Sequence, residues 1–450
     1  MDAIGLDRSA THQQKRGLSP LPEESMIQSQ LHPLRLKADP SRVVVRPFHL
    51  AWQGTPDTSR AQRLVDQVLS LDDREIGRQL KSVMHDFEQR HWQTRKVFLK
   101  RFREICSFLN LSLAGIGDKR QQLIGAYFCH EYSYAAAALM NPSIVPHPDQ
   151  TGLDRHTTRI IISLRAVGEG HISSISFREG LVSARGGLEL APEPPFATAA
   201  DAPNLDAVSD GPVTVFRHED ANLSGTVIFP VTPAQSNGLE DLRLTHFIHE
   251  DGRQEYFGTY TAFSGRGIRS ELLRTSDFRA IDLVPMTGEA ARNKGMALFP
   301  QKIDGRYMMI GRQDGQNMFL LGSDDLTHWD EGQLLMAPKY AWEFVQIGNC
   351  GAPILIDEGW LVLTHGVGAM RQYAIGAVLL DRDDPSKIIG RTRFPVLEAE
   401  DDDRNGYVPN VVYTCGGMRV GDQLFMPYGI SDSSIGFAFL PLKDLVAALT

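Results

Sequence analysis

Two adjacent acids stand in the segment "GLEDLRLTHF", residues 238–247, which otherwise alternates like a β-strand. They are Glu240 and Asp241, and Arg243 follows closely. A carboxylic acid held among cations is suited to general acid catalysis, in which it gives a proton to a departing oxygen. Neighbouring side chains on a strand point to opposite faces, so we expect only Asp241 to reach a pocket and Glu240 to be structural. A plain salt bridge between Asp241 and Arg243 is the competing interpretation.

Basic side chains elsewhere in the chain suggest what such an acid would work with. An inverting displacement at a sugar carbon needs an acid for the departing oxygen and a nucleophile on the opposite face. Hydrolysis normally needs a second carboxylate to activate water, whereas inorganic phosphate is already anionic and needs fixed cations around its oxygens. Arg269, Lys294 and His365 could provide them. A solvated Lys294 and an ordinary strand-end His365 bonded to a carbonyl are the competing interpretations.

A repeat in the second half of the chain supplies the elements that would position these residues. Four turns, each followed by an aromatic-rich strand, have glycines at Gly252, Gly305, Gly359 and Gly421, in steps of 53, 54 and 62 residues. An earlier copy fits "RIIISLRAVGEGHISSISFREG". Each glycine is expected in a hairpin turn. Because one short sheet cannot bury both faces alone, this period is typical of a β-propeller, and we predict an all-β, five-bladed propeller over residues 141–450.

In a propeller the inner strands of all blades converge on one axial depression, so residues far apart in sequence can meet there. We therefore collected the polar residues at equivalent places near the starts of the inner strands, together with two that end later strands. The first group is Asn141, Arg165, Asp241, Arg243, Lys294 and Asn349, and the second is His365 and Asp432.

The first third of the chain has a different character. Residues 1–40 are polar, contain several prolines and show no period, so we expect a disordered or loosely packed arm. Residues 41–140 are predicted to form a helical segment, with a third helix from about Lys119 to Met140. Helical additions to propellers often mediate assembly, so a homo-oligomer is expected. Apolar residues at helical spacing mark the first two helices: Ile76, Leu80, Val83, Met84 and Phe87, then Phe98, Phe102, Ile105 and Leu109.

Composition and charge limit the classes of molecule that the protein could bind. The net charge is -9, with Lys+Arg 46 against Asp+Glu 55, which gives no basic face for a nucleic acid. The first residues have no apolar core of signal-peptide length, and no later run is long enough to span a membrane, so we expect a cytoplasmic protein without a membrane partner. The four cysteines are far apart and lack CxxC pairing, and His130–Glu131 lacks a second histidine at HExxH spacing. We expect neither a metal nor an organic cofactor.

Several segments carry a family resemblance. They are "GLEDLR", "GNCGAPILIDEGWLVLTHGVG", "YAIGAVLLDRDDPSKIIGR", "GYVPNVVYTCGG" and "MPYGISDSSIGFA". In this order they resemble the motifs of glycoside hydrolase family 130, the β-mannoside phosphorylases and related β-mannosidases. The resemblance covers residues 141–450, and the helical segment resembles only the longer members. It implies a five-bladed propeller that cleaves a β-1,2- or β-1,4-linked manno-oligosaccharide, or mannosyl-glucose, with phosphate as co-substrate and releases α-mannose 1-phosphate.

The resemblance also implies roles for individual residues. Asp241 in "EDLR" matches the family's general acid, whose proton is thought to pass through the 3-hydroxyl of the bound mannose. Leu242 replaces the commoner proline of that motif, which leaves the local turn open. The remaining positions fall into two sets: Arg269 (with Arg266 as its alternative), Lys294 and His365 match phosphate-binding positions, and Asn141, Arg165 and Asp432, together with Arg243, are assigned to substrate binding.

Two other functions remain open at this point. A β-mannosidase of the same fold would use water and would need a glutamate base where the cations sit. A noncatalytic propeller that binds a carbohydrate or protein would not need an acid facing an anion pocket. The linkage and the acceptor sugar depend on loops at the propeller mouth, including "HPDQTGLDRHTTR" and "EAEDDDRNGY".

Overall fold

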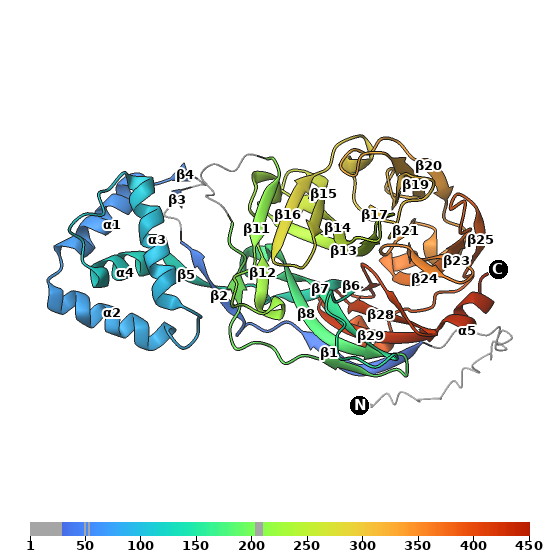
Figure 1. Cartoon of the computed structure of the whole chain (residues 1–450), viewed down its shortest axis with the longest axis horizontal. Coiled ribbons are helices and arrows are strands. Elements are labelled where there is room, and N and C mark those ends of the chain that lie inside the picture. The colour runs from blue at the N-terminus through green and yellow to red at the C-terminus, as the bar shows by residue number, and fades with distance from the viewer. Residues whose placement is uncertain (1–28, 49–50, 53–54, 203–209) are drawn as a thin grey trace, which may run out of the picture.

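A computed structural model describes residues 29–48, 51–52, 55–202 and 210–450. Most of the helix lies before residue 128, and strands dominate the rest (Figure 1). Residues 1–28, the larger part of the expected arm, lie outside the described residues. In the part of the chain that the structure describes, no helix is long and apolar enough to cross a membrane. All four cysteines are free thiols, and Cys106, Cys350 and Cys415 are buried.

The helical segment is a small bundle. Its first helices begin where an aspartate accepts a hydrogen bond from the first turn: Asp57 caps α1 and Asp72 caps α2. The two apolar patterns lie in α2 and α3, as their spacing predicts, and α1, α3 and α4 share one core. The helices are α1 (Thr58–Ser70), α2 (Asp73–Phe87), α3 (Thr94–Leu109) and α4 (Asp118–Tyr127), and a short α5 (Leu442–Ala447) lies near the C-terminus.

The third predicted helix is wrong in its second half. Helix α4 ends at Tyr127 rather than near Met140. The next residues form β5 (Cys129–Ser133), which pairs antiparallel with β2 (Val43–Pro47). The alanines that follow favour a helix by propensity, but strand pairing with distant segments overrides that weak preference.

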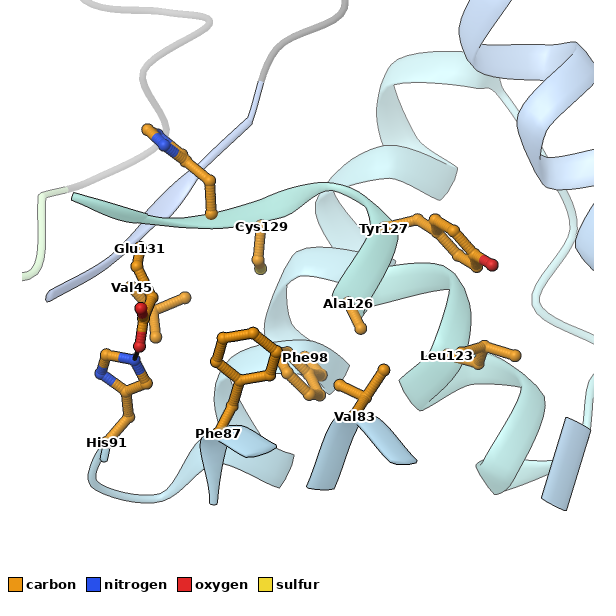
Figure 2. Close-up of a pocket in the computed structure, with 11 residues that line it drawn as sticks. Val45, Val83, Phe87, His91, Phe98, Leu123, Ala126, Tyr127, Cys129 and Glu131 are labelled. Carbon is orange, nitrogen blue, oxygen red and sulfur yellow. Dashed lines mark hydrogen bonds and ion pairs between the residues drawn. The ribbon is translucent and has the colours of Figure 1, made fainter. Parts of the chain in front are cut away.

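A pocket of about 190 Å³ lies where the bundle meets the β2–β5 pair. Figure 2 shows Phe87, Phe98 and Ala126 around it, with Glu131 at one side. His91 Nε2 lies 2.6 Å from Glu131 Oε1, and Arg90 also pairs with that carboxylate. Glu131 is therefore held by Arg90 and His91 at the side of this pocket.

The expected arm is partly ordered. Strand β1 (Gln30–Lys37) pairs antiparallel with β29 (Ser434–Pro441), with Leu31 opposite Ala438. Leu31 also packs against the core beneath that sheet. Residues 30–37 are thus an edge strand of the last sheet rather than a loose arm, because its alternating apolar side chains find an unpaired strand edge at the other end of the chain.

The strands follow one another in antiparallel groups, and Figure 1 shows β6, β13, β17 and β21 near the middle of the strand-rich part. The first sheet contains β6 (Ala138–Pro146), β7 (Thr157–Val167), β8 (Ser173–Ser183), β9 (Leu188–Leu190), β10 (Thr198–Ala199), β11 (Val213–Phe216), β12 (Thr226–Ile228), β13 (Gly238–Ile248), β14 (Gln254–Phe263), β15 (Ile268–Thr275) and β16 (Ala280–Pro285). The next sheet contains β17 (Ala297–Leu298), β18 (Tyr307–Gly311), β19 (Met318–Ser323) and β20 (Gln333–Met336), and the one after it contains β21 (Gln346–Asn349), β22 (Ile354–Ile356), β23 (Gly359–Val367), β24 (Tyr373–Leu380) and β25 (Ile388–Arg391). The last sheet contains β26 (Val412–Tyr413), β27 (Met418–Val420), β28 (Gln423–Ile430) and β29 together with β1. A separate short pair is formed by β3 (Ala51–Trp52) and β4 (Thr55–Pro56).

Neighbouring groups share hydrophobic cores. Residues of β6 to β8 pack with β13 to β16, and those of β13 to β16 pack with β17 to β19. Residues of β18 to β20 pack in turn with β21 to β24. The first and last groups also meet, since Ile160 and Phe437 belong to one core. Gly252, Gly305 and Gly421 lie in turns between paired strands, at φ values of 82°, 75° and 60°. Gly359, at φ 147°, is the first residue of β23 and directly follows the turn from β22. The hairpins predicted at all four glycines are therefore confirmed.

Candidate active site

Asp241 lies in a bulge of β13. The pairing register with β14 shifts between Glu240 and Arg243, and Asp241 has φ 57°, a left-handed conformation that is uncommon outside glycine. Both acids consequently contact one guanidinium: Arg165 Nη2 lies 2.6 Å from Glu240 Oε1, and Arg165 Nη1 lies 3.0 Å from Asp241 Oδ1. The prediction that the two acids point to opposite faces is therefore wrong, because the bulge interrupts the alternation of the strand.

Asn141 also lies in a bulge, in β6, and it contacts the same Asp241 carboxylate. Its φ is 50°, and the register of β6 with β7 shifts between Met140 and Ser143. Asn141 Nδ2 donates to Asp241 Oδ1 at 2.6 Å. A Cβ at Gly429 would lie 3.2 Å from the Asn141 backbone nitrogen, so a glycine in β28 leaves room for this bulge. Two predicted site residues 100 positions apart are thus brought together.

The two acids differ in how they are neutralised. Glu240 is bound by two cations, since Lys294 Nζ lies 2.8 Å from its second oxygen, and its side chain is 9% exposed. Asp241 is 14% exposed, and both Asn141 and Arg165 contact its Oδ1. Burial alone would raise the pKa of Asp241, but the charges of Arg165 and Arg243 outweigh it and hold the pKa below its usual range. Asp241 is therefore ionised in the protein without ligand.

Arg243 supports the bulge from beneath. Its Nη1 donates to the Asp241 backbone carbonyl at 2.9 Å, and its Nη2 donates to the Tyr413 hydroxyl at 2.8 Å. Burial opposes its charge, but Tyr413 and Asp241 raise the pKa of Arg243 above its usual range. These hydrogen bonds give Arg243 a positioning function around Asp241, and its substrate-binding role stays a prediction.

His365 lies on β23 beside a second cation. Its Nε2 is 3.2 Å from Arg312 Nη1 and 3.1 Å from the Gln346 side-chain amide, whose oxygen faces the imidazole and accepts from it. Burial, and then the charges of Arg312 and Arg243, lower the pKa of His365 well below its ordinary value. The structure thus corrects the charge expected of His365: the imidazole is neutral and can offer a hydrogen bond, while the positive charge belongs to Arg312.

Several buried polar atoms between these residues lack a partner in the protein. Tyr413 connects the Asp241 cluster with His365, because its hydroxyl accepts from Arg243 and its ring lies 4.9 Å from the His365 ring. Asn349, which is 1% exposed, has no hydrogen-bond partner for either side-chain atom, and His365 Nδ1 and Asn141 Oδ1 also lack one. Buried polar groups are normally satisfied, so these atoms indicate where a polar ligand or water would bind.

Arg269 belongs to a different cluster. On β15 its Nε donates to Glu271 Oε1 at 2.7 Å, and Tyr260 and Gln235 hydrogen-bond the other Glu271 oxygen. Its alternative, Arg266, lies in the exposed turn between β14 and β15. The structure does not bring either arginine into contact with the Asp241 cluster, and the phosphate-binding role of Arg269 stays a prediction.

Asp432 lies in the turn between β28 and β29, where Ser431 and Asp432 both have positive φ. Burial and the negative charge of Asp241 raise the pKa of Asp432 to about 6, against the opposing effects of Arg165 and Arg371. Asp432 therefore lies within electrostatic reach of Asp241 and Arg165, as expected of a residue of the same site.

This raised pKa predicts a pH-dependent gain in stability for Asp432→Asn. The carboxyl has a higher pKa in the folded protein than in the unfolded chain, so its ionisation opposes folding above pH 6 and has no effect below about pH 4. A shift of about two pH units corresponds to about 3 kcal/mol. The free energy of unfolding, measured with urea, should rise by about that amount at pH 8 and hardly change at pH 4. An equal change at both pH values would contradict the environment assigned to Asp432, and the exposed Asp401→Asn is the control.

Three residues of this cluster were missed from the sequence: Arg312, Gln346 and Tyr413. A signal for Arg312 was available in the repeat, because it follows its turn glycine by seven residues and His365 follows its own by six. Gln346 and Tyr413 carry no charge that would have drawn attention to them. Among the residues that the structure describes, no group of three or more His, Cys, Asp or Glu side chains could hold a metal ion.

Comparisons with known proteins identify the family of the chain. The family model of glycoside hydrolase family 130, described as β-1,4-mannooligosaccharide phosphorylase, matches residues 200–450, more than half of the chain. A 1,2-β-oligomannan phosphorylase of Thermoanaerobacter sp. (strain X514) is 39% identical over 155 residues, 34% of this chain and 52% of that protein. A β-1,2-mannobiose phosphorylase of the same organism is 36% identical over 245 residues, 52% of this chain and 75% of that protein.

A solved structure shows the same fold. The β-1,2-mannobiose phosphorylase of Listeria innocua, in complex with β-1,2-mannobiose, aligns with a TM-score of 0.50 at 21% identity and covers 70% of this chain and 92% of that one. The chain matches only about half of the length of the Thermoanaerobacter 1,2-β-oligomannan phosphorylase.

Proposed function

Because the chain belongs to glycoside hydrolase family 130, we propose that it is an inverting phosphorylase that cleaves a β-mannoside with inorganic phosphate and releases α-mannose 1-phosphate. The substrate would be a β-1,2- or β-1,4-linked manno-oligosaccharide or a mannosyl-glucose, the classes named for its relatives. In this proposal residues 141–450 are a five-bladed propeller, the helical segment 41–140 supports a homo-oligomer, and the protein acts in the cytoplasm without a nucleic acid or membrane partner.

The observation that carries the proposal is the unequal treatment of the two adjacent acids. Glu240 is bound by Arg165 and Lys294, at 2.6 and 2.8 Å, and so is a poor base for activating water. Asp241 is tied through one oxygen only and is more exposed. One available acid beside several cations suits a reaction whose nucleophile arrives already charged.

Asp241 must gain a proton for this reaction, since it is ionised without ligand. A bound sugar excludes water from the carboxylate, and an anionic phosphate adds negative charge nearby, and both effects raise a carboxyl pKa. We infer that binding of both substrates protonates Asp241, which then passes the proton toward the departing oxygen through the 3-hydroxyl of the mannose. Asn141 and Arg165 fix its Oδ1 and leave Oδ2 for the substrate.

The phosphate would lie on the other side of the sugar. Arg312 provides charge, neutral His365 provides a hydrogen bond, and Lys294 adds a cation that it shares with Glu240. Asn141, Arg165 and Asp432 would hold the mannose. No further cofactor is needed for this chemistry.

The proposal is tested by incubating the protein with β-1,2- and β-1,4-mannobiose, with and without phosphate, and following the anomeric protons by NMR. We expect α-mannose 1-phosphate to form only when phosphate is present, and the α configuration identifies inversion. Equal release of free mannose in both tubes would contradict it.

A β-mannosidase is the second candidate, and Asp432 is the observation that favours it. A carboxyl with a pKa near 6 close to Asp241 could act as a base for water. In that case mannobiose would be cleaved without phosphate, and Asp432→Asn would remove that cleavage.

A further inference from the structure

Two exposed aromatic rings, those of His171 and Tyr407, contact each other. His171 lies in the turn between β7 and β8, and Tyr407 lies in the loop before β26. Their ring centroids are 5.9 Å apart, with an angle of 32° between the planes. Tyr407 is 59% exposed and His171 is also exposed, so both rings keep surface open to a ligand. We call these two side chains the ring pair.

The ring pair is tied to two predicted sugar-binding residues. His171 is followed two residues later by Ser173, whose Oγ accepts a hydrogen bond from Arg165 Nε at 2.9 Å. The Tyr407 backbone nitrogen donates to Ser433 Oγ at 2.7 Å, and Ser433 adjoins Asp432. The ring pair therefore bridges the segments that carry Arg165 and Asp432, although its two members are 236 positions apart.

The ring pair and the anion-binding side chains come from different elements of the fold. Arg312 follows β18 and His365 lies on β23. His171 lies between β7 and β8, and Tyr407 precedes β26. An inverting displacement places the nucleophile and the leaving group on opposite faces of the reacting sugar. With phosphate at Arg312, the leaving group belongs on the side of the mannose away from Arg312 and His365.

The chemistry of the rings fits a sugar. A pyranose presents C–H groups on its faces and hydroxyls around its edge, and Tyr and His likewise combine an apolar ring with polar atoms. His171 is held with φ 59°, a conformation costly for a non-glycine residue, directly after Gly170 at φ 70°. The turn therefore accepts strain while presenting an imidazole at its tip.

We propose that the ring pair of His171 and Tyr407 is the platform on which the leaving-group sugar of the β-mannoside stacks. The platform thus determines how well the protein discriminates between acceptor sugars. This inference rests on the proposed phosphorylase function and adds to it the position of the acceptor.

The test uses the synthetic direction, with α-mannose 1-phosphate as donor and mannose or glucose as acceptor, and follows phosphate release. Tyr407→Ala should raise the KM for the acceptor about fivefold to tenfold, the size expected for one lost ring stacking contact. The KM for mannose 1-phosphate should stay within about twofold. Tyr407→Phe keeps the ring and should remain close to the parent protein, and His171→Asn, which tolerates the left-handed backbone but lacks the ring, should resemble Tyr407→Ala.

The outcomes separate this inference from the function beneath it. An active parent protein whose acceptor KM is unchanged in both Tyr407→Ala and His171→Asn would overturn the platform alone. A rise in the KM for mannose 1-phosphate equal to that for the acceptor would also overturn it, because the rings would then contact the donor sugar. A parent protein that releases no phosphate with any acceptor would contradict the phosphorylase function and, with it, the platform.

Discussion

Asp241→Asn is expected to lower the kcat for phosphorolysis of a mannobiose about a thousandfold, within the range that general acids contribute. The amide keeps the shape of the side chain and can still accept hydrogen bonds from Asn141 and Arg165, so the bulge of β13 should persist. What is lost is the proton that the departing oxygen needs. Steady-state kinetics measure the loss, and the circular dichroism spectrum and melting temperature check the fold.

Two controls separate proton donation from binding. Glu240→Gln changes the adjacent acid, which also contacts Arg165, and should weaken substrate binding while leaving kcat within about tenfold, because Glu240 gives no proton. An activated substrate such as 4-nitrophenyl β-mannoside needs little protonation of its leaving group, so Asp241→Asn should recover most of its activity on it. Equal loss on both kinds of substrate would show that Asp241 binds sugar rather than supplying a proton.

The second large effect is expected at Arg312. Arg312→Gln should raise the KM for phosphate roughly a hundredfold, because loss of a buried charged partner typically costs 2–5 kcal/mol, and change the KM for the mannoside little. The reason is that His365 is neutral, so Arg312 carries the positive charge at this end of the site. Initial rates over a range of phosphate concentrations at saturating mannoside give the constant directly.

Two further variants should raise the KM for phosphate by smaller amounts. Arg312→Lys keeps the charge but loses the planar fork of donors, so its KM for phosphate should lie between those of the parent and Arg312→Gln. His365→Ala removes a neutral hydrogen bond and should raise the same KM only about tenfold. An unchanged phosphate dependence in Arg312→Gln would place the anion elsewhere, with Arg269 as the next candidate.

The sequence predicted the members of the site better than their geometry. Turn glycines at a period of 50 to 60 residues indicated which strands recur, and the motif around Asp241 indicated the acid. The bulges at Asn141 and Asp241 could not be predicted, because a single shifted residue leaves the alternation of apolar side chains almost intact. The error about Glu240 has this cause.

The protonation states of the site residues could not be predicted from the sequence either. Whether His365 is charged depends on its burial and on Arg312 and Arg243, which come from other strands and are far away in the sequence. The same holds for the second half of the third helix and for β1, since pairing with segments distant in sequence decided both. Local pattern therefore identified the elements, and contacts distant in sequence determined the chemistry of the side chains.

The source of the oxygen at C1 of the released mannose tests the central claim most directly. A mannobiose is cleaved in ¹⁸O-labelled water with unlabelled phosphate, and the products are weighed by mass spectrometry. Our account predicts mannose 1-phosphate whose bridging oxygen is unlabelled, because phosphate is the nucleophile. Free mannose with ¹⁸O at C1, formed at the same rate with or without phosphate, would contradict it.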